Sequence, residues 1–411
     1  MSRGGWTRRG LGASFAGLAL SACAPVRRKE LVVWHAYRGR EALAFAKVIA
    51  TYNAGLPADG GPVRAVAIPY DTFADKITAA IPQGKGPDVF IFAHDRMGGW
   101  VETGRTVESI GFWADDAIRA GFLPRLVDAL VYRGELYGLP INFKSIALIY
   151  DRAAVPEPPK TTGALVALAK QFTDAPRGRF GLAYPYDDFF YHAALQNGFG
   201  GGVFDDKRRP ILNHPGNLAA GDLLLKWKNT DQILPSDPSF GLVQALFNER
   251  RAPLAISGPW FLGEVAKDID VAVAPMPTLD EADGAPIRPW LSIEAAYVAK
   301  GSARPEEAFR LAAYLAGQQA GRVLAVEGGQ LHAAAAVYSD PAVQADPIAQ
   351  AFRAQLDTAV PLPNVPDMTL VWSPADKALK RLVKGEATPA AAWGEAQADV
   401  VKSIAALRGR A

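Results

Sequence analysis

The chain of 411 residues contains a single cysteine, Cys23, and only five histidines. One cysteine cannot form an intramolecular disulfide, so a disulfide framework is excluded. The histidines are scattered along the chain, and no HExxH motif or other pair at metal-ligand spacing occurs. The sequence therefore predicts neither a bound metal nor any other cofactor.

Catalytic signatures are also missing. There is no GxSxG elbow, and KGPD (85–88) lacks the GK[ST] ending of a phosphate-binding loop. GFGGG (198–202) follows a predicted helix rather than a strand, which is the wrong setting for a dinucleotide-binding loop. Asp187 and Asp188 are neighbours, whereas glycosidase carboxylates flank their substrate from about 5–10 Å apart. We therefore expect no catalytic residue.

The chain has little net charge. Its 44 basic and 42 acidic side chains give a formal charge of +2 and are spread along the sequence, so there is no electrostatic footprint for nucleic acid. Hydrophobic residues make up 49% and charged residues 21%, a balance typical of a soluble globular protein. The length predicts two lobes or domains.

The one notable apolar stretch, LGASFAGLALSACAP (11–25), is too short to cross a bilayer, which takes about 20 residues. It follows the basic segment MSRGGWTRRG, and this order is typical of an export signal, whereas a buried first helix would explain neither the basic leader nor the cysteine. LSAC (20–23) resembles a bacterial lipobox, in which the cysteine is lipidated. We expect an export signal over residues 1–23, a lipid anchor at Cys23 and a short tether over 24–29.

The same segment leaves the export route open. Thr7, Arg8, Arg9 and Leu11 resemble a twin-arginine motif, from which Gly12 departs. Either route places the mature protein on the periplasmic or cell-surface side of a bacterial membrane.

Short β-branched runs alternate with helical stretches in the mature chain. Strands predicted at 31–35, 63–68 and 87–93 are separated by helices at 41–54 and 71–81. This alternation predicts an α/β fold with parallel sheets. Asp71 and either Thr161 or Thr162 are expected helix N-caps. Later strands are expected at 146–150, 179–184, 252–257, 271–275 and 294–299, and helices at 217–229, 240–250, 305–317 and 389–407.

Aromatic and polar residues gather where predicted strands end. These groups are Trp34 with His35, Tyr37 and Arg38; Phe92 with Asp95 and Arg96; Tyr184 to Tyr191 around Asp187 and Asp188; Trp260; and Trp372. Ligands of open α/β sheets bind beyond the carboxyl ends of strands. Flat aromatic faces pack on the apolar faces of sugar rings, while Asp and Arg bind hydroxyl groups. Any one of these aromatics fits core packing, but five such groups indicate a shared sugar site.

Six segments carry a family resemblance: LVVW, GPDVFIFAHDRMGGW, GELYGLPINFKSIALIYD, PPKT, ALFNERRAPLAISGPW and PLPNVPDMTLVWS. From about Leu31 to its end, the chain resembles bacterial maltose/maltodextrin-binding proteins, the extracytoplasmic solute-binding components of sugar ABC importers. The resemblance implies a type II periplasmic-binding-protein fold. In this fold each lobe is a mainly parallel sheet flanked by helices, and the ligand cleft lies at the hinge.

The resemblance also implies an organisation and partners. The first lobe would hold residues 30–140 and 293–338, and the second 141–292 and 339–411. The protein would be a monomer that binds an oligosaccharide and meets the permease subunits of an ABC transporter, which work with a cytoplasmic ATPase.

Carried over motif by motif, the resemblance implies a set of ligand-binding positions. They are Tyr37, Arg38, Phe92, Ala93, Asp95, Arg96, Lys144, Asp188, Phe190, Tyr191, Phe240, Trp260, Leu362, Trp372 and Asp376.

Three of these positions reverse the charge expected from the maltose pattern. Arg38 replaces an aspartate, Lys144 a glutamate and Asp376 an arginine. Pairing of Arg38 or Lys144 with Asp188 or Asp376 would compensate. A buried site rejects ligands that leave its polar groups unpaired, so these exchanges leave the identity of the sugar open.

Other interpretations fit parts of the same pattern. A secreted carbohydrate-active enzyme would use the aromatic site with Asp187 and Asp188, and a binding protein for a non-sugar solute such as iron would use Tyr184, Tyr186 and Tyr191. Asp95 and Arg96 can also form an ion pair with each other alone. Gly98 and Gly99 are expected at a close backbone approach, and Trp100 in the core.

Overall fold

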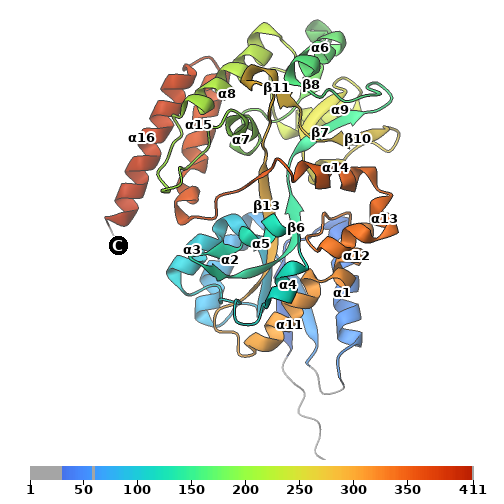
Figure 1. The fold of residues 1–411 in the computed structure, drawn as a ribbon, viewed down its shortest axis with the longest axis vertical. Helices are drawn as coiled ribbons and strands as arrows, with labels where there is room; N and C mark the ends of the chain where they lie inside the picture. The colour runs from blue at the N-terminus through green and yellow to red at the C-terminus, as the bar shows by residue number, and fades with distance from the viewer. Residues whose placement is uncertain (1–29, 58–60, 410–411) are drawn as a thin grey trace, which may run out of the picture.

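The computed structural model describes residues 30–57 and 61–409, so the predicted export signal, Cys23 and the tether lie outside the described residues. Figure 1 shows two lobes, with β6 (Gly138–Lys144) and β13 (Trp290–Val298) running between them. We call the part around the sheet of β1 the first lobe and the part around the sheet of β7 the second lobe. In the described part of the chain, no helix is long and apolar enough to cross a membrane.

The sheet of the first lobe has the strand order β14-β13-β3-β1-β2, and β6 also pairs with β13. β1, β2 and β3 are parallel, as the alternating pattern predicted, whereas β13 is antiparallel to β3 and β6. The strands of this lobe are β1 (Leu31–His35), β2 (Val63–Ala67), β3 (Val89–Ala93), β4 (Val131–Tyr132), β5 (Glu135–Leu136), β6, β13 and β14 (Val360–Pro361).

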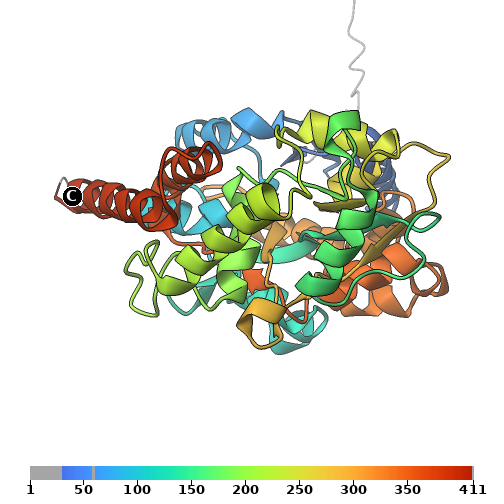
Figure 2. The same ribbon diagram turned by 90° about the horizontal axis from the view of Figure 1, so that it is seen from above.

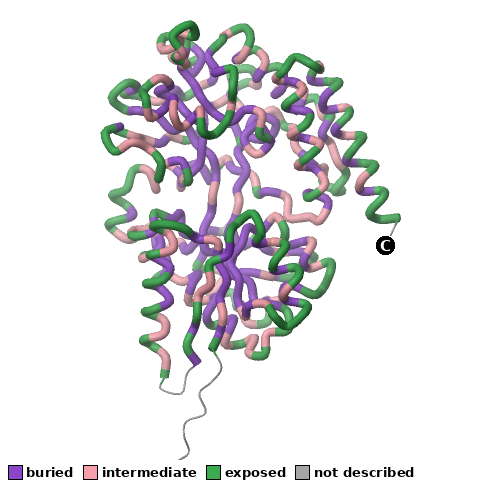
Figure 3. Tube along the Cα trace, turned by 180° about the vertical axis from the view of Figure 1, so that it is seen from behind, coloured by how far each residue is buried: buried purple, intermediate pink, exposed green. Residues whose placement is uncertain are grey.

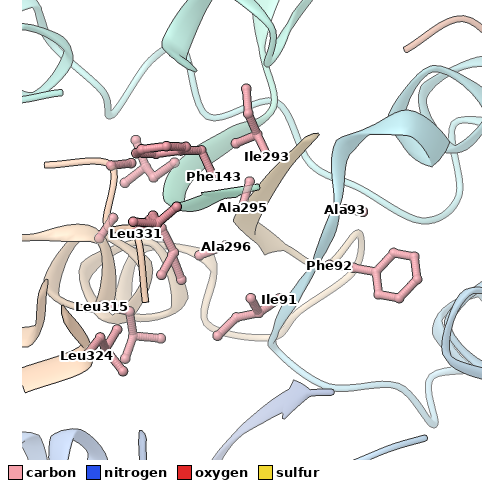
Figure 4. Close-up of a cluster of buried hydrophobic side chains, with 14 of the residues drawn as sticks. Ile91, Phe92, Ala93, Phe143, Ile293, Ala295, Ala296, Leu315, Leu324 and Leu331 are labelled. Carbon is pink, nitrogen blue, oxygen red and sulfur yellow. The ribbon is translucent and has the colours of Figure 1, made fainter. Parts of the chain in front are cut away.

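Helices cover both faces of this sheet, which is why every residue of β3 is buried. Figure 4 shows Ile91 on one side of β3, with Leu315 and Leu324, and Phe92 on the other side. The helices around this sheet are α1 (Gly39–Ala54), α2 (Tyr70–Ala80), α3 (Met97–Thr103), α4 (Asp116–Ala120), α5 (Pro124–Asp128), α11 (Pro305–Ala316) and α12 (Gln318–Val326).

The sheet of the second lobe has the order β10-β7-β9-β8. β8, β9 and β10 all run in one direction, since β8 is parallel to β9 and both β9 and β10 are antiparallel to β7. β7 alone opposes them. Strands and short hairpins of this lobe are β7 (Ala147–Asp151), β8 (Leu182–Ala183), β9 (Leu254–Ser257), β10 (Val271–Ala274), β11 (Thr278–Leu279) and β12 (Ala285–Pro286).

The strands β7 and β13 run opposite to the βαβ strands of their sheets for the same reason. Each enters its sheet directly from the other lobe, so it starts at the inter-lobe side, where the βαβ strands of that sheet end. The resulting sheets are mainly parallel in direction but contain antiparallel pairings that the alternating sequence pattern did not predict.

The helices of the second lobe enclose its sheet. Seen from above, α15 and α16 project at one side (Figure 2). The remaining helices are α6 (Thr162–Phe172), α7 (Phe189–Gly198), α8 (Pro215–Leu225), α9 (Phe240–Asn248), α10 (Pro259–Leu262), α14 (Pro347–Gln355), α15 (Trp372–Val383) and α16 (Pro389–Arg408), together with α13 (Pro341–Gln344), which packs between α14 and α12 of the first lobe.

One of the two predicted caps is confirmed. The Thr161 hydroxyl caps α6 by accepting the N–H of Ala164 at 3.2 Å. The prediction for Asp71 is wrong, because α2 begins one residue earlier than expected and its N-cap is Pro69, with no side-chain hydrogen bond.

Burial follows the two sheets. Figure 3 shows buried chain through the middle of both lobes and along the strands between them, with exposed positions on the outer helices. The predicted lobe boundaries at 140/141, 292/293 and 338/339 stay predictions.

Candidate ligand-binding site

The two lobes meet at residues 144–147, which join β6 to β7 and are called the inter-lobe link below. β3 ends at Ala93, which lies opposite Glu294 of β13, two positions from the pair Ser292–Lys144. In the second lobe β9 ends at Ser257, directly opposite Ala147. The carboxyl ends of β3 and β9 therefore lie at opposite ends of the link, and this is where an α/β fold binds its ligands.

Asp95 and Arg96 occupy the 3-10 turn His94–Arg96 that follows β3. Their side chains form a loose ion pair, with 3.5 Å between Arg96 Nε and Asp95 Oδ2. The Arg96 side chain is 43% exposed and that of Asp95 only 13%. Burial raises the pKa of Asp95, and Arg96 opposes that rise. The pair thus forms, as one interpretation predicted, and the guanidinium still reaches solvent.

Phe92 and Ala93 are buried at the end of β3, with exposures of 5% and 4%. Phe92 stacks between Phe73 and Tyr70, at centroid distances of 4.8 and 4.9 Å. Tyr70, which is 44% exposed, is the aromatic residue that reaches the surface here. Sequence reasoning did not include Tyr70, although it lies between the predicted strand 63–68 and the predicted helix 71–81.

Lys144 pairs with a partner that the sequence did not indicate. Its ammonium lies 2.9 Å from Glu294 Oε1, so it does not compensate for Asp188 or Asp376. The Asn142 amide donates to Glu294 Oε2 at 3.4 Å and to the hydroxyl of Tyr37 at 3.1 Å. Burial lowers the pKa of Lys144, but Glu294 and Glu41 raise it more, so the net pKa is raised and the ammonium keeps its charge. Arg38 lies exposed nearby, on the same loop as Tyr37.

Aromatic side chains from four separate segments meet in the second lobe. We call them the aromatic cluster: Phe190, Tyr191, Trp260, Trp290 and Trp372.

Within this cluster the rings run in sequence from Trp260 to Phe190, Trp290 and Trp372. The successive centroid distances are 6.0, 6.0 and 5.4 Å. The Trp260 indole N–H also donates to the hydroxyl of Tyr191 at 3.3 Å. Trp290 is buried at the start of β13, while Trp260 is 36% exposed and Phe190 and Trp372 are half-buried. The aromatic cluster therefore consists of partly exposed rings that are held in place by packing with a buried ring.

Two carboxylates mark the start of α7 beside this cluster. Asp188 Oδ1 accepts the N–H of Phe190 at 2.8 Å, and Asp376 Oδ1 accepts the N–H of Phe189 at 2.9 Å. Partial burial, followed by the charge of Asp376, raises the pKa of Asp188 to about 6, against the lowering effect of the Phe190 N–H. The pKa of Asp376 is also raised by burial. Asp188 remains exposed, so it can accept further hydrogen bonds.

Two of the predicted ligand-binding positions lie outside the aromatic cluster. Phe240 is 37% exposed and its ring contacts Phe261, at 6.1 Å between centroids. Leu362 is buried, and its N–H donates to Leu291 O of β13.

Two of the tyrosines considered for iron binding lie in the core of the second lobe. Tyr184 and Tyr186 are buried, and the Tyr186 hydroxyl donates to the carbonyl of Pro235. Across the described ranges, no group of three or more His, Cys, Asp or Glu side chains is placed to hold a metal ion.

Comparison with known proteins identifies the family to which this arrangement belongs. The family model for bacterial extracellular solute-binding proteins matches residues 46–322. A maltotriose-binding protein of Pyrococcus abyssi is 30% identical over 361 residues, which cover 86% of this chain and 78% of the relative. A galactooligosaccharide-binding protein of Bacillus subtilis is 25% identical over 402 residues, which cover 92% of each chain.

The fold agrees with this assignment. The crystal structure of a cyclo/maltodextrin-binding protein complexed with maltotetraose superposes with a TM-score of 0.83 at 27% identity, covering 91% of this chain and 97% of that one. The expected two-lobed periplasmic-binding-protein fold is confirmed. The chain belongs to the family of bacterial extracellular solute-binding proteins.

Proposed function

We propose that the protein binds a neutral oligosaccharide of the maltodextrin kind at the inter-lobe link and delivers it to the permease of an ABC importer, without chemical change. The lobes close around the ligand by a hinge motion at the strands that join them. The cytoplasmic ATPase that drives such a permease is the implied further partner.

The observation that carries the proposal is the aromatic cluster. Trp260, Phe190 and Trp372 come from three segments far apart in sequence. Phe190 and Trp372 nevertheless contact the buried Trp290, and Trp260 contacts Phe190, so the partly exposed rings form one row. Large aromatic surfaces left partly open to water are more than a core requires, and they match the apolar C–H faces of sugar rings. Asp188 at the edge of the cluster supplies an acceptor for hydroxyl groups.

The polar groups of the first lobe support the same ligand class. Asp95, Arg96 and Lys144 lie near the ends of β3 and β6, close to the inter-lobe link. Together with Asp188 they would bind the hydroxyl groups of a sugar whose ring faces rest on the aromatic cluster. The related maltotriose-binding and galactooligosaccharide-binding proteins make an oligosaccharide the first choice of ligand.

A thermal-shift titration tests the proposal. Maltotriose, maltotetraose, a galactooligosaccharide and trehalose are each added to the purified protein. A bound ligand raises the free energy of unfolding by RT ln(1 + [L]/Kd), and the melting temperature therefore rises with ligand concentration. At least one of the oligosaccharides should give a saturable shift. A protein that responds to none of these sugars, but to a peptide, an amine or a metal ion, contradicts the sugar assignment.

A second assay separates binding from catalysis. The protein is incubated with the sugar that gives the shift, and new reducing ends are measured over hours. No increase above a buffer control is expected, whereas steady production of reducing ends would instead identify a carbohydrate-active enzyme.

We also propose that the protein is anchored to a bacterial membrane through a lipid on Cys23. Cys23→Ser in the full-length chain should shift the protein from the membrane fraction to the soluble fraction of expressing cells. Replacing Arg8 and Arg9 by lysine tests the twin-arginine route, which would then fail to export the protein.

A further inference from the structure

The described chain begins at the end of the first lobe that lies away from the inter-lobe link. Glu30 precedes β1, and β1 runs from Leu31 towards the link, parallel to β3. Figure 1 shows these blue N-terminal strands at the lower end of the first lobe, with the second lobe above. Val298 of β13, opposite Val89 at the start of β3, lies at the same end, six residues past Ser292. Six strand residues span about 20 Å, so this end, called the basal end below, lies about 20 Å from the link.

Hydrogen bonds bring three loops together around the start of β1. We call them the basal loops: residues 84–88, 104–107 and 299–304. The Asp88 N–H donates to Val32 O, and the Ala299 N–H donates to Asp88 O, both at 2.9 Å. The Lys300 N–H donates to Thr106 O at 3.0 Å. Residues far apart in sequence therefore form one surface at the basal end.

The acidic group of the basal loops is tied into the backbone. The loops contain four basic residues and one acidic residue, Asp88. One oxygen of the Asp88 carboxylate accepts the N–H of Val32 at 2.9 Å, and the other accepts the hydroxyl of Ser302 at 2.6 Å. The carboxylate thus joins β1 to the loop before α11, and it forms no ion pair with a described basic residue.

Two of the four basic residues also have no acidic partner. The other two pair with glutamates, at 2.8 and 3.3 Å. Lys85 and Arg105 are exposed and form no ion pair with any residue of the described ranges. The nearby turn between α1 and β2 contains one acidic residue, Asp59, which lies outside the described residues. The basal loops therefore present unpaired positive charge to solvent.

The sequence that precedes β1 adds charge of the same sign. Residues 24–29 read APVRRK, with three basic residues and no acidic one. Together with the basal loops, these segments contain seven basic residues and one acidic residue, whereas the whole chain has a formal charge of only +2. The part of the chain nearest to Cys23 is therefore far more positive than the chain as a whole.

The distance in sequence from Cys23 to Glu30 limits how far the basal end can lie from a membrane. An extended chain spans at most about 3.3–3.6 Å per residue, so seven residues reach about 25 Å. A lipid on Cys23 would therefore hold the basal end within about 25 Å of the headgroups. Anionic lipids attract basic residues that come within a Debye length of the surface, about 8 Å at physiological ionic strength.

We propose that the basal end of the first lobe rests on the anionic phospholipid headgroups of the membrane, through Lys85, Arg105 and the basic residues of 24–29. The inference rests on the lipid anchor proposed above and adds a protein surface to it. A basic patch next to a lipid chain is a second attachment signal. The contact gives the anchored protein one orientation, with the inter-lobe link about 20 Å above the headgroups and the second lobe beyond it.

Energy transfer on vesicles tests this orientation. The lipid occupies the only native cysteine, so a cysteine introduced by Gln83→Cys or Gln171→Cys can be labelled alone. Gln83 is exposed beside the basal loops, and Gln171 is exposed on α6 of the second lobe. The full mature lipidated protein is placed in vesicles that carry an acceptor dye on their headgroups. One set is pure phosphatidylcholine, and the other contains two parts phosphatidylcholine to one part phosphatidylglycerol.

We expect more transfer from position 83 than from position 171 on both kinds of vesicle. At position 83, phosphatidylglycerol should increase the transfer further, and about 0.5 M salt should remove that increase, because the attraction is electrostatic. Equal transfer from the two positions, or equal transfer at position 83 on the two kinds of vesicle, overturns the proposal.

Charge reversal identifies the residues that make the contact. The double variant Lys85→Glu, Arg105→Glu should lose the increase that phosphatidylglycerol causes. The matched control is Lys384→Glu, Lys402→Glu, which reverses two exposed lysines of the second lobe that also form no ion pair with a described residue. The control should keep the increase, and equal effects of the two double variants would contradict a contact at the basal end. Melting temperatures of both variants show whether either one has lost its fold.

Sedimentation of the unlipidated protein separates the surface from the anchor. The mature chain with Cys23→Ser is mixed with the same vesicles. Each basic residue near an anionic surface strengthens partitioning by about fivefold, so Lys85→Glu, Arg105→Glu should weaken it by about twentyfold or more. The second-lobe control should change it by less than about twofold. Unmodified Cys23 in the mass spectrum of the cellular protein would overturn the anchor, whereas unlipidated protein that binds the two kinds of vesicle equally overturns the basal surface alone.

Discussion

Gly98 shows how a single residue fixes a contact between distant segments. Its N–H donates to Asn364 O at 3.0 Å, and a Cβ built on it would lie 2.1 Å from the same oxygen. Gly99, its neighbour on α3, has no atom within 4 Å of such a Cβ. The prediction of a close backbone approach is thus confirmed for Gly98 and wrong for Gly99, which faces open space.

This difference between the two glycines gives a direct test. Gly98→Ala should lower the free energy of unfolding by about 1–3 kcal/mol, because backbone must move to admit the methyl group. Gly99→Ala is the control and should be neutral or stabilising by up to about 1 kcal/mol, since alanine favours the helix. Urea unfolding of both variants measures the effect, and equal stabilities would contradict the packing argument.

His192 makes stability depend on pH. It is fully buried against Trp393, has no hydrogen-bond partner among the described residues, and burial lowers its pKa to about 3. Below its ordinary pKa of 6.5 the unfolded chain therefore binds a proton that the folded chain does not, and stability falls as the pH drops from 6.5 towards 3. The buried His35, His94 and His332, each with a pKa lowered to about 4, act in the same direction.

His192→Leu should remove one of these contributions. The wild type should lose about 2 kcal/mol more than the variant between pH 7 and pH 5. Denaturant unfolding at the two pH values provides the comparison. The same pH dependence in both proteins would show that His192 binds a proton without unfolding.

The sequence could indicate some site residues and not others. Asp95 and Arg96 are charged and come just after a predicted strand, so the local sequence is enough to identify them as candidate site residues. Glu294 is 150 positions from Lys144 and lies inside an otherwise apolar strand, EAAYV, which reads as core. Only the pairing of β6 with β13 brings the two together, and no local pattern encodes that pairing.

At the scale of elements, regular periodic segments were predicted well. β1 has the predicted bounds, and α16, predicted at 389–407, runs over Pro389–Arg408. β6 was missed because Gly138 and Pro140 disfavour a strand. Pro140 lacks an N–H, and the register with β13 shifts beside it, between Glu294 and Ala295. The strand forms because its residues are almost all buried against β13 and the helices α5 and α11.

Thr161 and Asp71 both look like helix N-caps in the sequence, but only Thr161 caps a helix in the structure. Thr161→Ala should lower the free energy of unfolding by about 1 kcal/mol, because α6 loses its N-cap and the hydroxyl also donates to Asp280 at 2.8 Å. Asp71→Ala should cost less than about 0.5 kcal/mol, since Asp71 makes no cap. Thermal or urea unfolding measures both, and a larger loss for Asp71→Ala would contradict the observed start of α2.

At the scale of the molecule, two lobes joined by a few strands predict a change of shape on binding. Small-angle X-ray scattering should show a smaller radius of gyration with saturating maltotriose, or with whichever sugar binds, than without ligand. Lys144→Met at the same sugar concentration should show a smaller change, restored by raising the concentration. Identical scattering curves with and without a ligand that calorimetry shows to be bound would contradict hinge closure.

The position of β13 also governs when the first lobe can form during synthesis. β3 gains its second neighbour only when Val298 is available to pair with Val89, more than 200 residues later in the chain. At about 5–20 residues per second, β3 waits roughly 10–40 s for that partner after it leaves the ribosome. Contacts of such long sequence separation also form slowly. The first lobe is thus begun early and completed late, and the nascent chain carries an unpaired, apolar strand edge for about half of its production.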